Sequence, residues 1–141
     1  MAVNQKLIDR LLKRGEEDKK IEIGLEGLAD TPFYVKLTKE EFKQAKKEAK
    51  EGLDPENPAH EEIYRNRLDA LIVAASLYDH NEEKVFSGAL YEALDIDFDP
   101  IKAVGKFIEY AEEQIINAAA LECIGFIPKE KAKKDNEAAK N

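Results

Sequence analysis

The sequence has few of the residues that support covalent or metal-based chemistry. Its 141 residues include one cysteine, two histidines, one methionine and no tryptophan. The single cysteine, Cys123, excludes an internal disulfide, and a free cysteine among apolar neighbours behaves as a small hydrophobic residue. His60 and His80 lie far apart in polar segments, so we interpret them as surface residues rather than as ligands of one metal ion.

Long apolar runs and catalytic motifs are also missing. No stretch approaches the roughly 20 apolar residues of a membrane-spanning helix, and the first ten residues lack the apolar core of a signal peptide. The sequence contains no phosphate-binding loop, nucleophile elbow, His-Glu-x-x-His motif or paired-cysteine metal motif. We therefore predict a cytoplasmic protein that is not an enzyme, needs no cofactor and does not contact a membrane. A small hydrolase or metal-dependent enzyme is the least favoured alternative.

Charge is abundant and mainly negative. The net charge is -8, with 37% charged and 43% hydrophobic residues, which disfavours nucleic acid as a partner. An acidic DNA mimic is disfavoured too, because the acids are interleaved with lysines. Residues 129–141 hold five lysines and three acids, so residues 1–128 carry -10. We predict one compact domain over residues 1–128 and a disordered charged tail over residues 129–141.

The first part of the chain predicts a helix followed by a β-hairpin. Apolar residues recur at helical spacing between Val3 and Leu12. Residues 20–38 then contain two alternating runs, Ile21–Leu25 and Phe33–Leu37, which a Gly/Asp/Pro turn separates. A lone hairpin is marginal in water, so its apolar face has to rest on helices or pair with another chain.

The rest of the chain predicts helices. A Thr38–Glu41 capping box opens one helix, and we interpret residues 52–58 as a flexible connector to a helical core over residues 60–127. There we expect a central helix from Glu61, a short helix through Leu90, and one helix of roughly six turns from Pro100 to a cap at Gly125. The predicted fold is α+β and predominantly helical, with a small N-terminal β-hairpin and a four- to five-helix C-terminal core.

The acidic step at residues 95–99 resembles the start of a calcium-binding loop. An EF-hand requires glycine at the sixth position and an acid at the twelfth, whereas Pro100 and Lys106 stand there. We predict instead that Asp99 caps the following helix, with Ile96 and Phe98 pointing inward.

Aromatic residues are concentrated in the second half of the chain, at Tyr78, Phe86, Tyr91, Phe98, Phe107, Tyr110 and Phe126. We expect about five of these seven in the core and the remainder on the surface. Exposed apolar clusters mark partner sites. The candidate partner-binding residues are Phe107, Tyr110 and Phe126.

The order of these segments resembles a known family. An apolar Ile72-Val-Ala-Ala-Ser76 helix is followed by Phe86-Ser-x-x-Leu-Tyr-Glu-Ala-Leu94, by the helix-opening Asp99-Pro100, and by a closing Ile124-Gly-Phe126. This order is similar to that of tail assembly chaperones of long-tailed phages and prophages of Gram-positive hosts. The similarity covers residues 60–127 and, more loosely, residues 21–37. The lysine-rich segment at residues 39–51 and the connector at residues 54–58 depart from the family pattern.

The resemblance implies a chaperone that binds the helical tape-measure protein during tail assembly and is absent from the mature virion. It further implies the tail-tube protein and a second copy of the chain as candidate partners. A longer frameshifted product is expected if Lys133-Lys134 or Lys140-Asn141 is encoded by a slippery heptamer. The alternative function is an oligomeric structural adaptor or head–tail connector that associates through the edge of the hairpin.

Overall fold

A small antiparallel sheet forms as the alternating sequence predicts. The computed structural model describes residues 4–16 and 19–126. β1 (Ile21–Ile23) pairs with β2 (Phe33–Val35) in the register Ile21↔Val35 and Ile23↔Phe33. The predicted hairpin is therefore confirmed. β2 pairs on its other side with β3 (Leu77–Tyr78), a third strand that the sequence did not predict.

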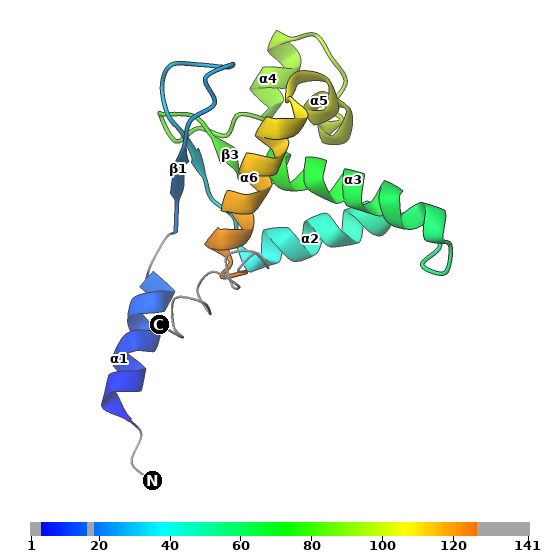
Figure 1. Ribbon diagram of the computed structural model, residues 1–141. Helices are drawn as coiled ribbons and strands as arrows, with labels where there is room; N and C mark the ends of the chain where they lie inside the picture. The colour runs from blue at the N-terminus through cyan, green and yellow to red at the C-terminus, as the bar shows by residue number, and fades with distance from the viewer. Residues whose placement is uncertain (1–3, 17–18, 127–141) are drawn as a thin grey trace, which may run out of the picture.

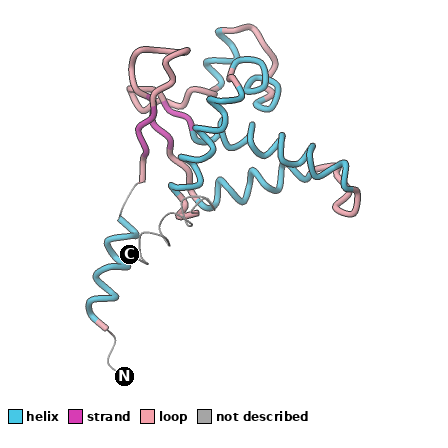
Figure 2. Tube along the Cα trace, in the orientation of Figure 1, coloured by secondary structure: helices cyan, strands magenta, loops and turns pink. Residues whose placement is uncertain are grey.

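The described residues also form six helices (Figures 1 and 2). They are α1 (Gln5–Glu16), α2 (Lys39–Lys50), α3 (Pro58–Ser76), α4 (Gly88–Ala93), α5 (Pro100–Phe107) and α6 (Tyr110–Cys123). The fold is thus α+β and predominantly helical. α3 packs against α2, α5 and α6, while α6 also contacts β1 and β2. No helix in the described part of the chain is long and apolar enough to cross a membrane.

The core lies where α3 and α6 meet the sheet. Its fully buried side chains come from both halves of the sequence and include Val35, Ile72, Val73, Leu77, Val104 and Ile116. Val35 and Phe33 place the apolar face of the hairpin in this core, as the marginal stability of a lone hairpin requires. The thiol of Cys123 donates to the carbonyl oxygen of Val35 at 3.3 Å. The carboxyl end of α6 is thereby joined to the central strand.

Two predicted helix starts are confirmed. The hydroxyl of Thr38 accepts from the Glu41 amide at 3.1 Å, and the Thr38 amide donates to the Glu41 carboxylate at 3.0 Å, which completes the capping box of α2. A carboxylate oxygen of Asp99 accepts from the Lys102 amide at 3.2 Å before Pro100 in α5. Both caps satisfy amides that have no partner within the helix.

The prediction of one long helix from Pro100 to Cys123 is wrong. α5 ends at Phe107, Ile108 adopts an extended backbone, and α6 begins at Tyr110. The amide of Glu109 donates to the Glu112 carboxylate at 3.0 Å, which stabilises a new helix start. The apolar stripe continues across this break because Ile108 stays buried. Periodicity alone therefore did not reveal the break.

The connector between α2 and α3 joins a helical hairpin, and the two helices lie side by side in Figure 1. Asn57 caps α3, which starts at Pro58 rather than at Glu61. The Asp54 amide donates to Nδ1 of His60 at 2.8 Å, and the Glu56 amide donates to the Asp54 carboxylate at 3.0 Å. These bonds hold the connector in a defined turn. The predicted tail at residues 129–141 lies outside the described residues.

Candidate functional site

The exposed apolar side chains fall largely into two groups. One is on α1, where Leu7, Leu11 and Leu12 are 51%, 55% and 61% exposed. The second, which we name the α5 rim, comprises Leu94, Phe98, Phe107 and Tyr110 on the segment that contains α5. Exposed apolar groups of this kind are typical of surfaces that bind another chain.

The α5 rim is built around two short connections between helices, one before α5 and one after it. Leu94 caps the carboxyl end of α4, Phe98 precedes the Asp99 cap of α5, and Phe107 and Tyr110 lie on either side of the break before α6. The ring of Phe98 contacts that of Tyr91, with centroids 4.8 Å apart. Burial, with a smaller effect of the Asp99 carboxylate, raises the pKa of Tyr91. Phe98 is therefore held against the body while 75% of it stays exposed.

A shallow hollow of about 330 Å³ lies beside α5. Its lining includes Asp95, Asp97 and Asp99 on one side and Lys102, Lys106 and Phe107 along the helix. Residues 92–110 together contain five carboxylates and two lysines. The rim therefore combines exposed apolar groups with a negative field, which suits a basic amphipathic helix.

The structure places the three predicted partner-binding residues on two separate surfaces. Phe107, Tyr110 and Phe126 are 37%, 77% and 57% exposed. Phe107 and Tyr110 belong to the α5 rim. Phe126 follows the other end of α6, a 14-residue helix that is about 21 Å long. Gly125, with φ of 81°, turns the chain there as predicted.

The prediction that about five of the seven aromatics lie in the core is wrong. Phe86 and Tyr91 are buried, Tyr78 is half-buried, and Phe98, Phe107, Tyr110 and Phe126 are exposed. The prediction that Phe98 points inward is also wrong, since only its neighbour Ile96 is half-buried. Asp95, which precedes both residues, has a positive φ of 52°. Leu94 and Phe98 were thus missed as surface residues.

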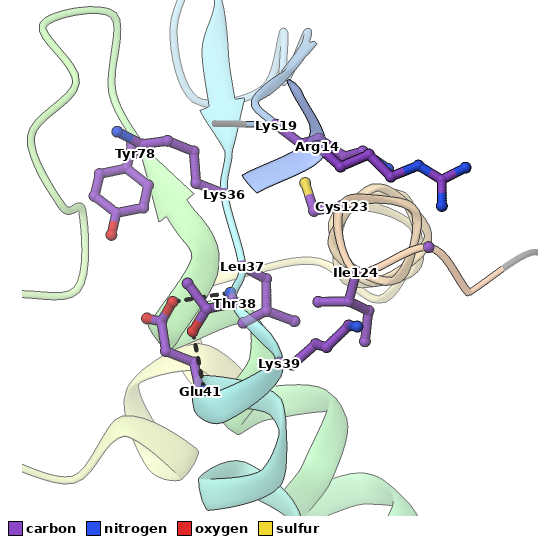
Figure 3. A pocket seen from close by; sticks show the side chains of 11 residues that line it. Arg14, Lys19, Lys36, Leu37, Thr38, Lys39, Glu41, Tyr78, Cys123 and Ile124 are labelled. Carbon is purple, nitrogen blue, oxygen red and sulfur yellow. Dashed lines mark hydrogen bonds between the residues drawn. The ribbon is translucent and has the colours of Figure 1, made fainter. Parts of the chain in front are cut away.

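A second hollow, of about 690 Å³, lies at the opposite end of α6 (Figure 3). Its lining includes four basic residues, Arg14, Lys19, Lys36 and Lys39. The basic groups do not converge, because Lys36 extends over the ring of Tyr78 at 4.5 Å whereas Lys39 extends toward Ile124. Burial raises the pKa of the Cys123 thiol in this hollow, so it is a poor nucleophile there.

The described residues contain no group of three His, Cys, Asp or Glu side chains arranged to hold a metal ion. His60 serves the α2–α3 turn, where its Nδ1 accepts from the Asp54 amide. Comparison of the chain with protein-family models, with curated proteins and with solved structures found no significant match. The fold and the site therefore define a class only: a mostly helical α+β domain with an acidic apolar rim.

Proposed function

We propose that this protein is a non-enzymatic tail assembly chaperone of a phage or prophage. It acts in the bacterial cytoplasm, where it binds helical segments of the tape-measure protein before and during tail assembly. The observation that carries the proposal is the α5 rim, where exposed Leu94, Phe98, Phe107 and Tyr110 lie within a segment of five carboxylates and two lysines.

The rim favours a client helix with one apolar and one basic side. Phe98 and Tyr110, 75% and 77% exposed, offer large apolar surface that a helix covers on binding, and aromatic groups of this kind dominate binding energies. The surrounding carboxylates attract lysine and arginine and repel acidic segments. The chaperone thereby covers apolar client surface that would otherwise aggregate.

The test uses the full-length chain and a fluorescently labelled helical segment of the tape-measure protein from the phage or prophage that carries this gene. We expect binding to weaken at least about tenfold in Phe98→Ala and Tyr110→Ala, the loss typical of an interface anchor. Leu28→Ala is the matched control, because Leu28 is 45% exposed and lies outside the rim. Unchanged affinity in both rim variants, or equal loss in the control, contradicts the proposal.

An oligomeric structural adaptor is the alternative function. The three exposed leucines of α1 favour it, because such a stripe also serves a permanent subunit contact. β1 is in addition an edge strand of the sheet. A protein that forms stable assemblies but does not bind the tape-measure segment would support the adaptor.

A further inference from the structure

α1 presents an apolar stripe that the described chain leaves uncovered. Leu7, Leu11 and Leu12 are each at least half exposed, and Ile8 between them is only half-buried. The helix has 12 residues, and isolated helices shorter than about 12–15 residues are marginal in water. α1 therefore gains stability when another surface covers this stripe.

The charge of α1 is opposite to that of the α5 rim. α1 carries the four basic residues Lys6, Arg10, Lys13 and Arg14 and two acids, Asp9 and Glu16. Residues 92–110 hold five carboxylates and two lysines. Pairing of α1 with a second α1 brings like charges together, whereas pairing of α1 with the rim brings opposite charges together. The rim is thus the better match within this chain.

The two surfaces lie at opposite ends of the molecule. Arg14 lines the hollow that also contains Cys123, Ile124 and Gly125 at the carboxyl end of α6. Tyr110, in the rim, begins α6 at its other end. α1 projects away from the body and from α5 in Figure 1. As it is placed, α1 is available to another molecule and not to its own rim.

We propose that α1 of one copy binds the α5 rim of a second copy. The contact joins two different surfaces, so each pair keeps one unused α1 and one unused rim. Such head-to-tail contacts grow into rings or open filaments rather than stopping at dimers. This self-association goes beyond the proposed function and needs no client, although it uses the same rim.

The test measures mass by sedimentation velocity over a range of protein concentrations. We expect the wild-type chain to grow past the dimer as concentration rises, and less so in high salt, which screens exposed charges. Leu11→Glu places a charge in the middle of the apolar stripe and Tyr110→Glu places one in the rim, so we expect each variant alone to stay monomeric. Leu28→Glu, a control outside both surfaces, associates like the wild type. Far-UV circular dichroism establishes that each variant is folded.

Mixing the two monomeric variants provides the decisive step. Leu11→Glu retains an intact rim and Tyr110→Glu retains an intact α1, so the mixture forms a one-to-one dimer that grows no further. A wild-type chain that is monomeric at all concentrations overturns the proposal, as does a mixture that stays monomeric. Dimers of Tyr110→Glu alone overturn it in favour of α1–α1 pairing. These measurements contain no client. Their failure would therefore overturn the self-association and leave the proposed function to its own binding test.

Discussion

At the residue scale, the carboxyls that face each other between α3 and α6 are the clearest source of pH sensitivity. Burial raises the pKa of Asp69, and burial together with the nearby Asp69 carboxylate raises that of Glu113. Asn117 is buried beside them, and its side-chain amide donates to the carbonyl oxygens of Asp69 at 3.1 Å and Glu113 at 2.9 Å. The Asn117 amide thus has hydrogen-bond partners on both helices, whereas repulsion between the Asp69 and Glu113 carboxylates disfavours the packing of α3 against α6.

We predict that Glu113→Gln stabilises the protein at neutral pH. An acid with a raised pKa binds more protons in the folded chain than in the unfolded one. Its contribution to the free energy of unfolding is therefore present at low pH and lost as the pH rises past the ordinary glutamate value of 4.5. The glutamine removes that loss, and we expect a gain of about 0.5 kcal/mol, a size typical of partly exposed sites.

Urea unfolding from pH 4 to pH 8 measures this gain. The wild-type free energy of unfolding should fall across the acidic part of the range, and the variant should show a smaller fall. Glu62→Gln, at an exposed position on α3, serves as the control and should leave the pH profile unchanged. Equal stability of wild type and Glu113→Gln at pH 7 would contradict the prediction.

At the scale of elements, the sequence predicted where helices start more reliably than whether one helix continues without a break. Thr38 with Glu41, and Asp99 with Pro100, satisfy helix amides through neighbouring residues, and such short-range bonds are readable in a sequence. The end of α5 has no comparable signal, because Ile108 keeps its place in the core while its backbone becomes extended. β3 was missed for a similar reason. Its two residues pair only with a distant strand.

We predict that Gly105→Ala stabilises α5. A methyl group at Gly105 meets no heavy atom within 4 Å, and alanine favours a helix interior by roughly 0.5–1 kcal/mol over glycine. Gly125→Ala is the contrasting variant. Space is open there too, but its φ of 81° strains any residue with a side chain, so the same substitution should destabilise.

Thermal and urea unfolding of the two variants test this contrast. The free energy of unfolding should rise in Gly105→Ala and fall in Gly125→Ala, while far-UV circular dichroism stays that of a folded helical protein. A fall in both variants would mean that α5 does not tolerate the added methyl group.

At the scale of the whole molecule, the sequence predicted the fold best where the apolar pattern of a segment matches the residues that the structure buries. The central helix was predicted from an apolar segment that is indeed buried at Ala70–Ala74, and the hairpin from strict alternation. The candidate site was predicted only in part, because exposure depends on tertiary packing. Phe107 and Tyr110 lie on either side of a helix break that the periodicity did not predict. Phe126 is separated from them by the length of α6.

The molecule consists of a buried core and of α1, which projects away from it (Figure 1). We predict that hydrogen exchange distinguishes these two parts. In dilute protein, the amides of α1 should exchange fastest among the helices, because its leucines have no described partner and a helix of this length is marginal alone. The buried part of α3 should exchange slowest. When concentration rises, binding to a second copy should protect α1 and leave α3 unchanged.

Leu11→Glu provides the control for this measurement. Its α1 should exchange rapidly at every concentration, since the substituted stripe no longer binds the rim. If α1 of the wild type were protected as strongly in dilute as in concentrated protein, its own chain would be covering the stripe. Because exchange resolves single segments, it distinguishes this covering from a general stabilisation of the fold, in which α3 and α6 would gain protection together with α1.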